Sequence, residues 1–174
     1  MDNHGQYDIL RKRAKELARP LQETEREKDV LKIVEFQLGS EIYGLALDHI
    51  LEVYPLRGLT PLPGVPSFVK GIINVRGQIV SVIDLRIFFE MNSEELTDTS
   101  SVIILQSENM EFGILADAII GIDTIPKIEI MPSLPTLTGI RADFLQGVSR
   151  ERLVILDGAK LLADTRLIVN EEVT

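Results

Sequence analysis

The sequence predicts a mainly β protein, an all-β sandwich or barrel with short helices and a helical N-terminal extension. Three observations support this fold class. From Lys32 onward apolar and polar residues alternate and β-branched residues are frequent, which is typical of strands. The apolar runs are short and separated by turn residues, as in sandwiches and barrels. Finally, the two halves of this region repeat one spacing of residues, which indicates two copies of one β unit.

Residues 1–30 carry a helical pattern instead. Seven basic and seven acidic residues cancel there, so the net charge of −9 belongs to residues 31–174. Five apolar residues have the 3,4,3,4 spacing of an amphipathic helix: Tyr7, Leu10, Ala14, Leu17 and Leu21. Pro20 should end or kink that helix, or begin a second short one. The helix could lie on its own domain, stay loose in solvent or bind a partner.

Seven strands are expected after this extension. Their runs are rich in β-branched residues and are bounded by turn residues: 34–38, 42–47, 71–75, 79–83, 101–105, 111–116 and 152–156. Turns at 39–41 and 76–78 should join the first four strands into two hairpins.

The internal repeat consists of two series with identical spacing. The first is Tyr43-Gly44, Asp48 and Val53, and the second is Phe112-Gly113, Asp117 and Ile122. Each is followed by a Pro-containing loop, a glycine and an apolar run that ends in Asp. We expect two units, roughly 33–100 and 101–165, although two unrelated amphipathic hairpins could match by chance. Because about 65 residues of β structure are marginal alone, the units should pack together and share apolar surface.

Composition excludes several classes of function. The 174 residues include no cysteine and two histidines, so disulfides, thiolate metal sites and a Ser-His-Asp triad lack material. The acidic balance, with a pI near 4.8, would repel a phosphate backbone, and we expect no nucleic-acid partner. The sequence has no signal-peptide pattern and no run of roughly 20 apolar residues, so we expect a cytoplasmic protein without direct membrane insertion.

Carboxylates are the remaining candidates for catalysis. Asp48, Asp84, Asp117 and Asp157 recur at equivalent places in the two units. At the end of an apolar strand an Asp side chain typically caps a turn or a helix start, so we favour capping over an active site. The Gly-rich motifs that cradle phosphates are also missing. We therefore expect no enzyme, no cofactor, no metal and no small-molecule substrate.

Two features suit protein docking. Residues 59–68 combine three prolines and one glycine with four apolar side chains, which makes a stiff loop that orders at little entropic cost. Folding of this loop over its own barrel end is an equal alternative. Arg76 lies in a turn between two apolar strands, where it could meet a carboxylate or carbonyls, or be solvated.

Together these segments resemble the CheW family of chemotaxis coupling proteins. The most specific part reads PLPGVPSFVKGIINVRG at 61–77. The others read YGLAL at 43–47, ILEV at 50–53, VIDLR at 82–86, FGILAD at 112–117 and FLQGV at 144–148. The resemblance covers residues 33 to about 165, and it divides the chain into an N-terminal helical extension, 1–30, and a CheW-like domain, 31–174.

The resemblance implies two intertwined five-stranded SH3-like β-barrels without enzymatic activity. Such proteins couple the cytoplasmic tip of chemoreceptors to the regulatory domain of a CheA-type histidine kinase, in arrays under the inner membrane. The receptor helix hairpin docks in the groove between the barrels, and the kinase domain has the same fold. By similarity, the receptor and kinase surfaces would include Arg76, Glu52, Ile50, Val53 and Asn74. A CheW-like module that serves a non-chemotaxis kinase pathway, for pili or another output, is the alternative.

Overall fold

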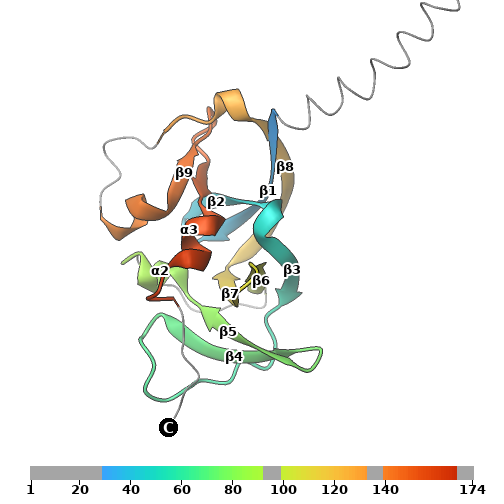
Figure 1. The fold of residues 1–174 in the computed structure, drawn as a ribbon, viewed down its shortest axis with the longest axis vertical. Coiled ribbons are helices and arrows are strands. Elements are labelled where there is room, and N and C mark those ends of the chain that lie inside the picture. Colours follow the sequence, from blue (N-terminus) through green and yellow to red (C-terminus); the bar gives the residue numbers. More distant parts are fainter. Residues whose placement is uncertain (1–28, 92–98, 133–138, 168–174) are drawn as a thin grey trace, which may run out of the picture.

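Two five-stranded sheets account for most of the structure, a computed structural model that describes residues 29–91, 99–132 and 139–167 (Figure 1). The strands are β1 (Val30–Leu38), β2 (Glu41–Ala46), β3 (Ile50–Pro55), β4 (Val69–Val75), β5 (Gln78–Ile83), β6 (Ser101–Gln106), β7 (Glu111–Ala116), β8 (Ala118–Pro126), β9 (Leu145–Val148) and β10 (Val154–Leu156). The helices are short: η1 (Leu47–His49), α2 (Leu85–Phe88), η2 (Lys127–Glu129), η3 (Ile140–Phe144) and α3 (Gly158–Ala163). The helix predicted within residues 1–30 lies outside the described residues.

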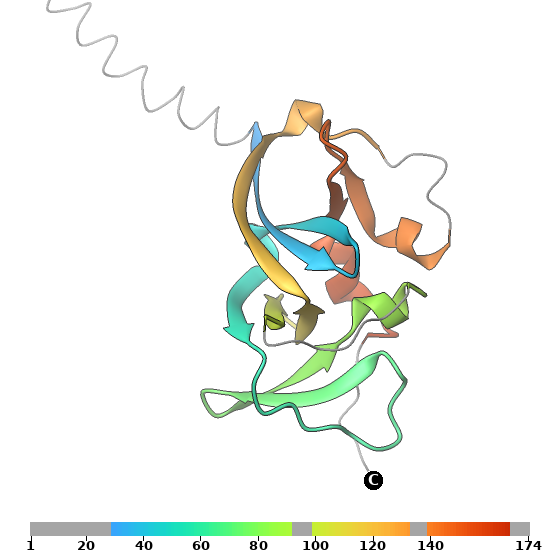
Figure 2. The same cartoon turned by 180° about the vertical axis from the view of Figure 1, so that it is seen from behind.

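Each sheet contains strands from both halves of the chain. One sheet has the order β8-β1-β2-β10-β9, and the other has the order β3-β6-β7-β5-β4. β3 leaves its own half to pair with β6, and β8 makes the reciprocal exchange by pairing with β1 (Figure 2). In addition, β10 joins β2 and β5 joins β7 in parallel. The two halves are therefore intertwined, and neither sheet can form from one half alone.

Strand pairing does not close either sheet within the described residues. β8 and β9 are the end strands of one order, and β3 and β4 are those of the other. A single isolated bridge joins Thr60 to Ile72 of β4, and a corresponding bridge joins Met131 to Val148 of β9. The prediction of a mainly β fold with short helices is confirmed, with two five-stranded sheets. Closed SH3-like barrels stay a prediction.

All seven predicted strands are present, with ends shifted by a few residues, but the prediction lacks β3, β8 and β9. β3 and β8 carry apolar residues on both faces, so their sequences do not alternate in polarity. β9 is only four residues long. β3 and β8 pair with strands that are distant along the chain, so no tight hairpin marks them in the sequence. β9 pairs with the next strand, β10, but through a loop of five residues.

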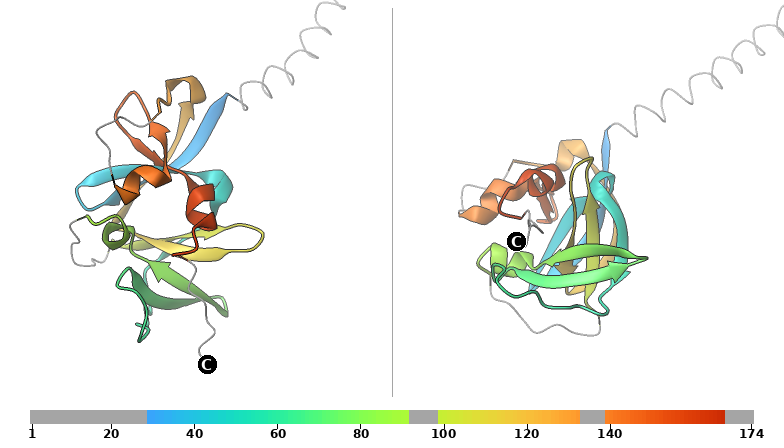
Figure 3. Two further views of the ribbon diagram at one scale, coloured as in Figure 1. Left: turned by 60° about the vertical axis from the view of Figure 1, so that its left-hand side comes forward. Right: turned by 60° about the horizontal axis from the view of Figure 1, so that its bottom comes forward.

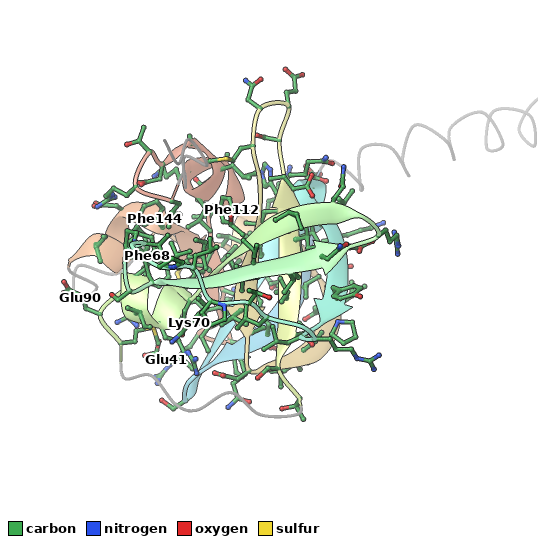
Figure 4. The ribbon with its side chains drawn as sticks, turned by 90° about the horizontal axis from the view of Figure 1, so that it is seen from below. Glu41, Phe68, Lys70, Glu90, Phe112 and Phe144 are labelled. Atoms are coloured by element: carbon green, nitrogen blue, oxygen red, sulfur yellow. The ribbon has the colours of Figure 1, made fainter. Side chains whose placement is uncertain are left out.

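Figure 3 shows the ribbon of the two sheets and the short helices α2 and α3 from two further sides. Apolar side chains fill three clusters, and the largest one draws on both sheets. Successive residues of one strand supply different clusters: Ile103 of β6 belongs to the shared cluster, and Ile104 belongs to a smaller cluster formed within the β3–β4 sheet. A third cluster lies within the β8–β9 sheet. Figure 4 shows Phe68 and Phe144 of the shared cluster close to α2, where their rings pack on Phe88.

A buried ion cluster fastens α2 to the start of β8. Asp84 caps α2 by accepting a hydrogen bond from the Arg86 backbone, and the Arg86 guanidinium donates to both oxygens of Asp84 at 3.0 and 2.9 Å. The same guanidinium donates to Asp117 at 2.8 Å, and Asp117 accepts the backbone N–H of Gly39 at 2.6 Å. Arg86 is 1% exposed and Asp84 is 0% exposed. The two halves of the chain thus share one charged group inside the fold.

The Pro-rich loop folds over its own sheet. Leu59 packs against the cluster of the β3–β4 sheet, while Val65 and Phe68 pack against the shared cluster. Gly71 in β4 permits this close approach, because a Cβ atom there would lie 2.1 Å from the carbonyl oxygen of Thr60. Of the two alternatives for this loop, packing on its own domain is the one observed.

Candidate docking surfaces

The β4–β5 hairpin ends in a tight turn that projects Arg76. Gln78 pairs with Val75, so the turn has two central residues, Arg76 and Gly77, and both have positive φ angles of 51° and 86°. Such a turn matches the right-handed twist of a hairpin. Asn74 supports it, because its Oδ1 atom accepts the backbone N–H of Gly77 at 2.8 Å. The predicted turn at 76–78 is thus one residue shorter than expected.

Arg76 forms an ion pair with Glu52 across the open end of the β3–β4 sheet. The Arg76 guanidinium lies 3.0 Å from Glu52 Oε2, and the Arg76 side chain is 79% exposed, while that of Glu52 is 22% exposed. The other carboxylate oxygen, Oε1, is buried and has no hydrogen-bond partner within the described residues. The exposed Arg76 guanidinium can donate further hydrogen bonds to a partner protein, whereas the buried Oε1 atom of Glu52 is not accessible to one.

The five predicted site residues fall on two different faces. In the register of β3, Glu52 lies opposite Ile104 and shares its face, within the β3–β4 sheet. Val53 lies opposite Ile103, on the face of the shared cluster, and Ile50 packs against that cluster. Arg76, Asn74 and Glu52 therefore form one group at the hairpin end of the sheet. Ile50 and Val53 belong to the face between the two sheets.

Exposed apolar residues on the two exchanged strands form an apolar surface that we define as Leu51 and Val53 of β3 with Ile120 and Ile122 of β8. Their exposed fractions are 51%, 40%, 53% and 70%. The register of each strand shifts where Leu51 and Ile120 lie, so that both are left without a direct partner. β3 and β8 lie on the same side of the molecule in Figures 1 and 2.

The prediction lacked Leu51, Ile120 and Ile122 as site residues. The repeat already matched Val53 with Ile122, and this match was the signal that could have found the second pair.

A hollow of about 470 Å³ is lined in part by Glu41, Tyr43 and Arg141. Arg141 donates to Glu41 at 2.8 Å and to the Tyr43 hydroxyl at 2.9 Å, and that hydroxyl donates to Glu41. Burial and the hydrogen bond to Glu41 raise the pKa of Tyr43 to about 12. The hydroxyl is therefore neutral at physiological pH, and it links β2 to η3 as a structural contact.

Two of the four repeated Asp residues, Asp84 and Asp117, share the Arg86 guanidinium. Asp84 and Asp157 cap α2 and α3 through their side chains, as predicted. Asp117 contacts Arg86, and Asp48 is exposed at η1. Across the described ranges no group of three or more His, Asp or Glu side chains is arranged to hold a metal ion. None of the helices in this part of the chain has the length and apolarity needed to cross a membrane.

Intertwined sheets, an ion-paired hairpin tip and exposed apolar residues are features that a protein-binding β scaffold can use. The chain belongs to the CheW-like domain family, which matches residues 32–166. It is 31% identical to the chemotaxis protein CheW of Klebsiella aerogenes over 79% of this chain and 85% of that protein. Protein FrzA of Myxococcus xanthus is also 31% identical, over 75% and 84%. The crystal structure of the scaffolding protein TtCheW from Thermoanaerobacter tengcongensis has a TM-score of 0.65 and 33% identity, covering 72% of this chain and 82% of that one.

Proposed function

We propose that this protein is a chemotaxis adaptor that couples chemoreceptors to a CheA-type histidine kinase without catalysing a reaction itself. Membership of the CheW-like domain family across residues 32–166 is the observation that carries this proposal. The four exposed residues of the apolar surface support it, because apolar groups that gather on one side of a soluble protein can mark a protein-binding site (Figures 1 and 2). In this proposal the CheW-like domain is residues 31–174, and each five-stranded sheet is an SH3-like barrel. The protein would act in the cytoplasm, at receptor arrays.

The apolar surface is the proposed site for the helix hairpin at the chemoreceptor tip. An amphipathic helix binds through apolar residues spaced along one face, and the two pairs on β3 and β8 offer apolar contacts from both sheets. Val53 and its neighbour Ile50 lie at the centre of this contact. The partly buried Ile50 would support Val53 from the shared cluster.

The hairpin tip is the proposed site for the regulatory domain of the kinase. Arg76 is ion-paired with Glu52, yet its side chain is 79% exposed and can donate to a partner. Asn74 fixes the turn that presents Arg76. Charged groups at the rim of an interface contribute mainly to orientation and association rate. The two partners would thus bind opposite faces of one strand, β3, whose alternate side chains face opposite ways.

Calorimetric titration of the full chain against each partner tests the proposal. The kinase regulatory domain and a receptor-tip fragment from the same genome are the two ligands. We expect Arg76→Glu to weaken kinase binding about tenfold and to leave receptor binding unchanged, since a rim charge contributes on the order of 1 kcal/mol. Val53→Asp should do the reverse. Arg57→Glu, at another exposed position, and Ile42→Asp, at another exposed apolar position, are the matched controls.

Two outcomes would contradict these assignments. If the unmodified chain binds neither ligand, the coupling function itself is wrong. If both substitutions weaken both ligands equally, the division between the two surfaces is wrong. Binding to the kinase domain without binding to any receptor tip would favour the alternative, a CheW-like module in a pathway other than chemotaxis. The resemblance to FrzA, whose name does not mention chemotaxis, supports keeping this second candidate.

A further inference from the structure

The outer end of the β8–β9 sheet exposes apolar side chains that the proposed docking surfaces do not use. Ile128 of η2 is 90% exposed, and Met131, just beyond this helix, is 48% exposed. Both residues follow β8, which is an end strand of its sheet and has no partner on its outer edge within the described ranges. Ile128 is the most exposed of the large apolar residues in this part of the chain, so a covering segment would remove a substantial apolar surface from water.

The N-terminal extension joins the domain at this place. Val30, the first residue of β1, pairs with Pro126 at the end of β8. The carbonyl oxygen of Asp29 accepts a hydrogen bond from the backbone N–H of Lys127 at 2.8 Å. Figure 1 shows η2 next to the start of β1. The extension therefore joins the domain at Asp29, which is hydrogen-bonded to Lys127, the residue before Ile128.

An acidic hollow lies beside the same strand. It has a volume of about 200 Å³, and its lining includes Glu35, Asp123, Glu129, Glu151 and Arg150. Arg150 lies 3.9 Å from Glu129, whereas the other three carboxylates form no ion pair within the described part of the chain. Burial, together with the hydrogen bond and the charge of Asp123, raises the pKa of Glu35. The three carboxylates of Glu35, Asp123 and Glu151 therefore have no neutralising cation within the described part of the chain.

The extension has the matching chemistry. Its apolar stripe ends at Leu21, and its basic run is Arg11-Lys12-Arg13 with Lys15. Pro20 lies just before the last residue of the stripe, and the segment of about nine residues from Pro20 to Asp29 spans up to roughly 30 Å when extended. That length allows the chain to reverse and to lie along the outer edge of β8.

We propose that the N-terminal extension docks in cis on this end of its own domain. The apolar stripe covers Ile128 and Met131, and the basic run faces the carboxylates of Glu35, Asp123 and Glu151. The attachment at Asp29 favours this occupant over a separate partner, because a tethered segment binds at a high effective concentration. The apolar surface on β3 and the hairpin tip stay free for coupling.

A nitroxide label on the full-length protein tests this docking. The chain has no cysteine, so Glu16→Cys provides a single labelling site, on the side of the predicted helix opposite the apolar stripe. Docking in cis predicts loss of the amide NMR signals of Ile128 and Glu129 at every protein concentration. The signal of Gly77, in the hairpin of the other sheet, should be unchanged. The variants Ile128→Asp and Arg11→Glu/Arg13→Glu should restore the lost signals, and the equally apolar control Ile79→Asp should not.

Three outcomes would overturn the proposal. Full signals at Ile128 and Glu129 in the labelled protein would mean that the extension does not dock there. Signal loss that occurs only between labelled and isotope-enriched chains in a mixed sample would identify a second copy as the occupant. Signal loss that persists in both Ile128→Asp and the Arg11→Glu/Arg13→Glu variant would show that neither the apolar nor the basic contact holds the extension in place.

Discussion

Arg86 offers a direct measure of the buried ion cluster. Replacing it with Met keeps the size of the side chain but removes the two guanidinium hydrogen bonds of 3.0 and 2.9 Å from Asp84, which is 0% exposed, and leaves the longer ion pair with Lys70 at 4.0 Å. Removing one partner of a buried pair leaves an uncompensated charge and costs about 3–5 kcal/mol. The total free energy of unfolding is typically about 5–15 kcal/mol. We therefore expect Arg86→Met to lose about 3–5 kcal/mol and to be marginally folded.

Arg166 is a matched control, because it contacts Asp164 with the same sequence spacing and through the same atoms, at 3.1 and 2.7 Å. This pair is 51% exposed at the arginine, which also lies over the rings of Phe88 and Phe144 at 5.3 and 5.7 Å, so Arg166→Met should cost much less than Arg86→Met. Urea denaturation followed by circular dichroism measures both variants. Adding Asp84→Asn and Asp117→Asn to Arg86→Met should recover about 2 kcal/mol, since Asn still caps a helix. Equal losses for the two arginines, or no recovery in the triple variant, would refute the reasoning from burial.

Three further predictions concern single side chains. Gly71→Ala should destabilise the protein by about 3 kcal/mol or prevent folding, because its Cβ would collide with the Thr60 carbonyl and its φ is 145°, and urea melts measure the loss. Glu35→Gln should stabilise the protein by about 0.5 kcal/mol at pH 7, because it removes repulsion from Asp123. Because the pKa of Glu35 is raised above its ordinary value of 4.5, this gain should fade as pH falls through the folded-state pKa and be absent below 4.5, where the carboxyl becomes protonated in both states, and melts at several pH values check it. Since the pKa of Tyr43 is raised from 10 to about 12, its ionisation favours the unfolded state between pH 10 and 12, and Tyr43→Phe should lack that part of the alkaline loss in thermal melts.

The strands could be predicted from the sequence, but their partners could not. Alternation of polarity reveals which residues of a strand share a face, and this was enough for the hairpins on either side of Gly77. It carries no information on which strand lies beside which. The exchange of β3 and β8 was therefore implied only by the family resemblance, and it is what places Glu52 within 3.0 Å of Arg76.

The candidate site was predicted in part for the same reason. Arg76 lies in a turn that its sequence marks clearly, whereas the exposure of Leu51 and Ile120 depends on register shifts that periodicity does not reveal. Arg86 shows a second limit of sequence patterns. An arginine that follows an apolar run is normally expected at the surface, yet here it is among the most deeply buried side chains. The cause is the pair of aspartates that bind its guanidinium. Asp84 lies two residues before Arg86, whereas Asp117 comes from a distant part of the chain.

The exchange of strands has a consequence for synthesis on the ribosome. β1 and β2 can form a hairpin early, but their sheet lacks β8, β9 and β10 until residue 156 has been made. At about 5–20 residues per second, the interval between the end of β5 and the end of β10 lasts roughly 4–15 s. During this time the first half presents unpaired strand edges and an incomplete core. Folding must therefore wait for nearly the whole chain, and the nascent protein is exposed to aggregation and to chaperone binding for most of its translation.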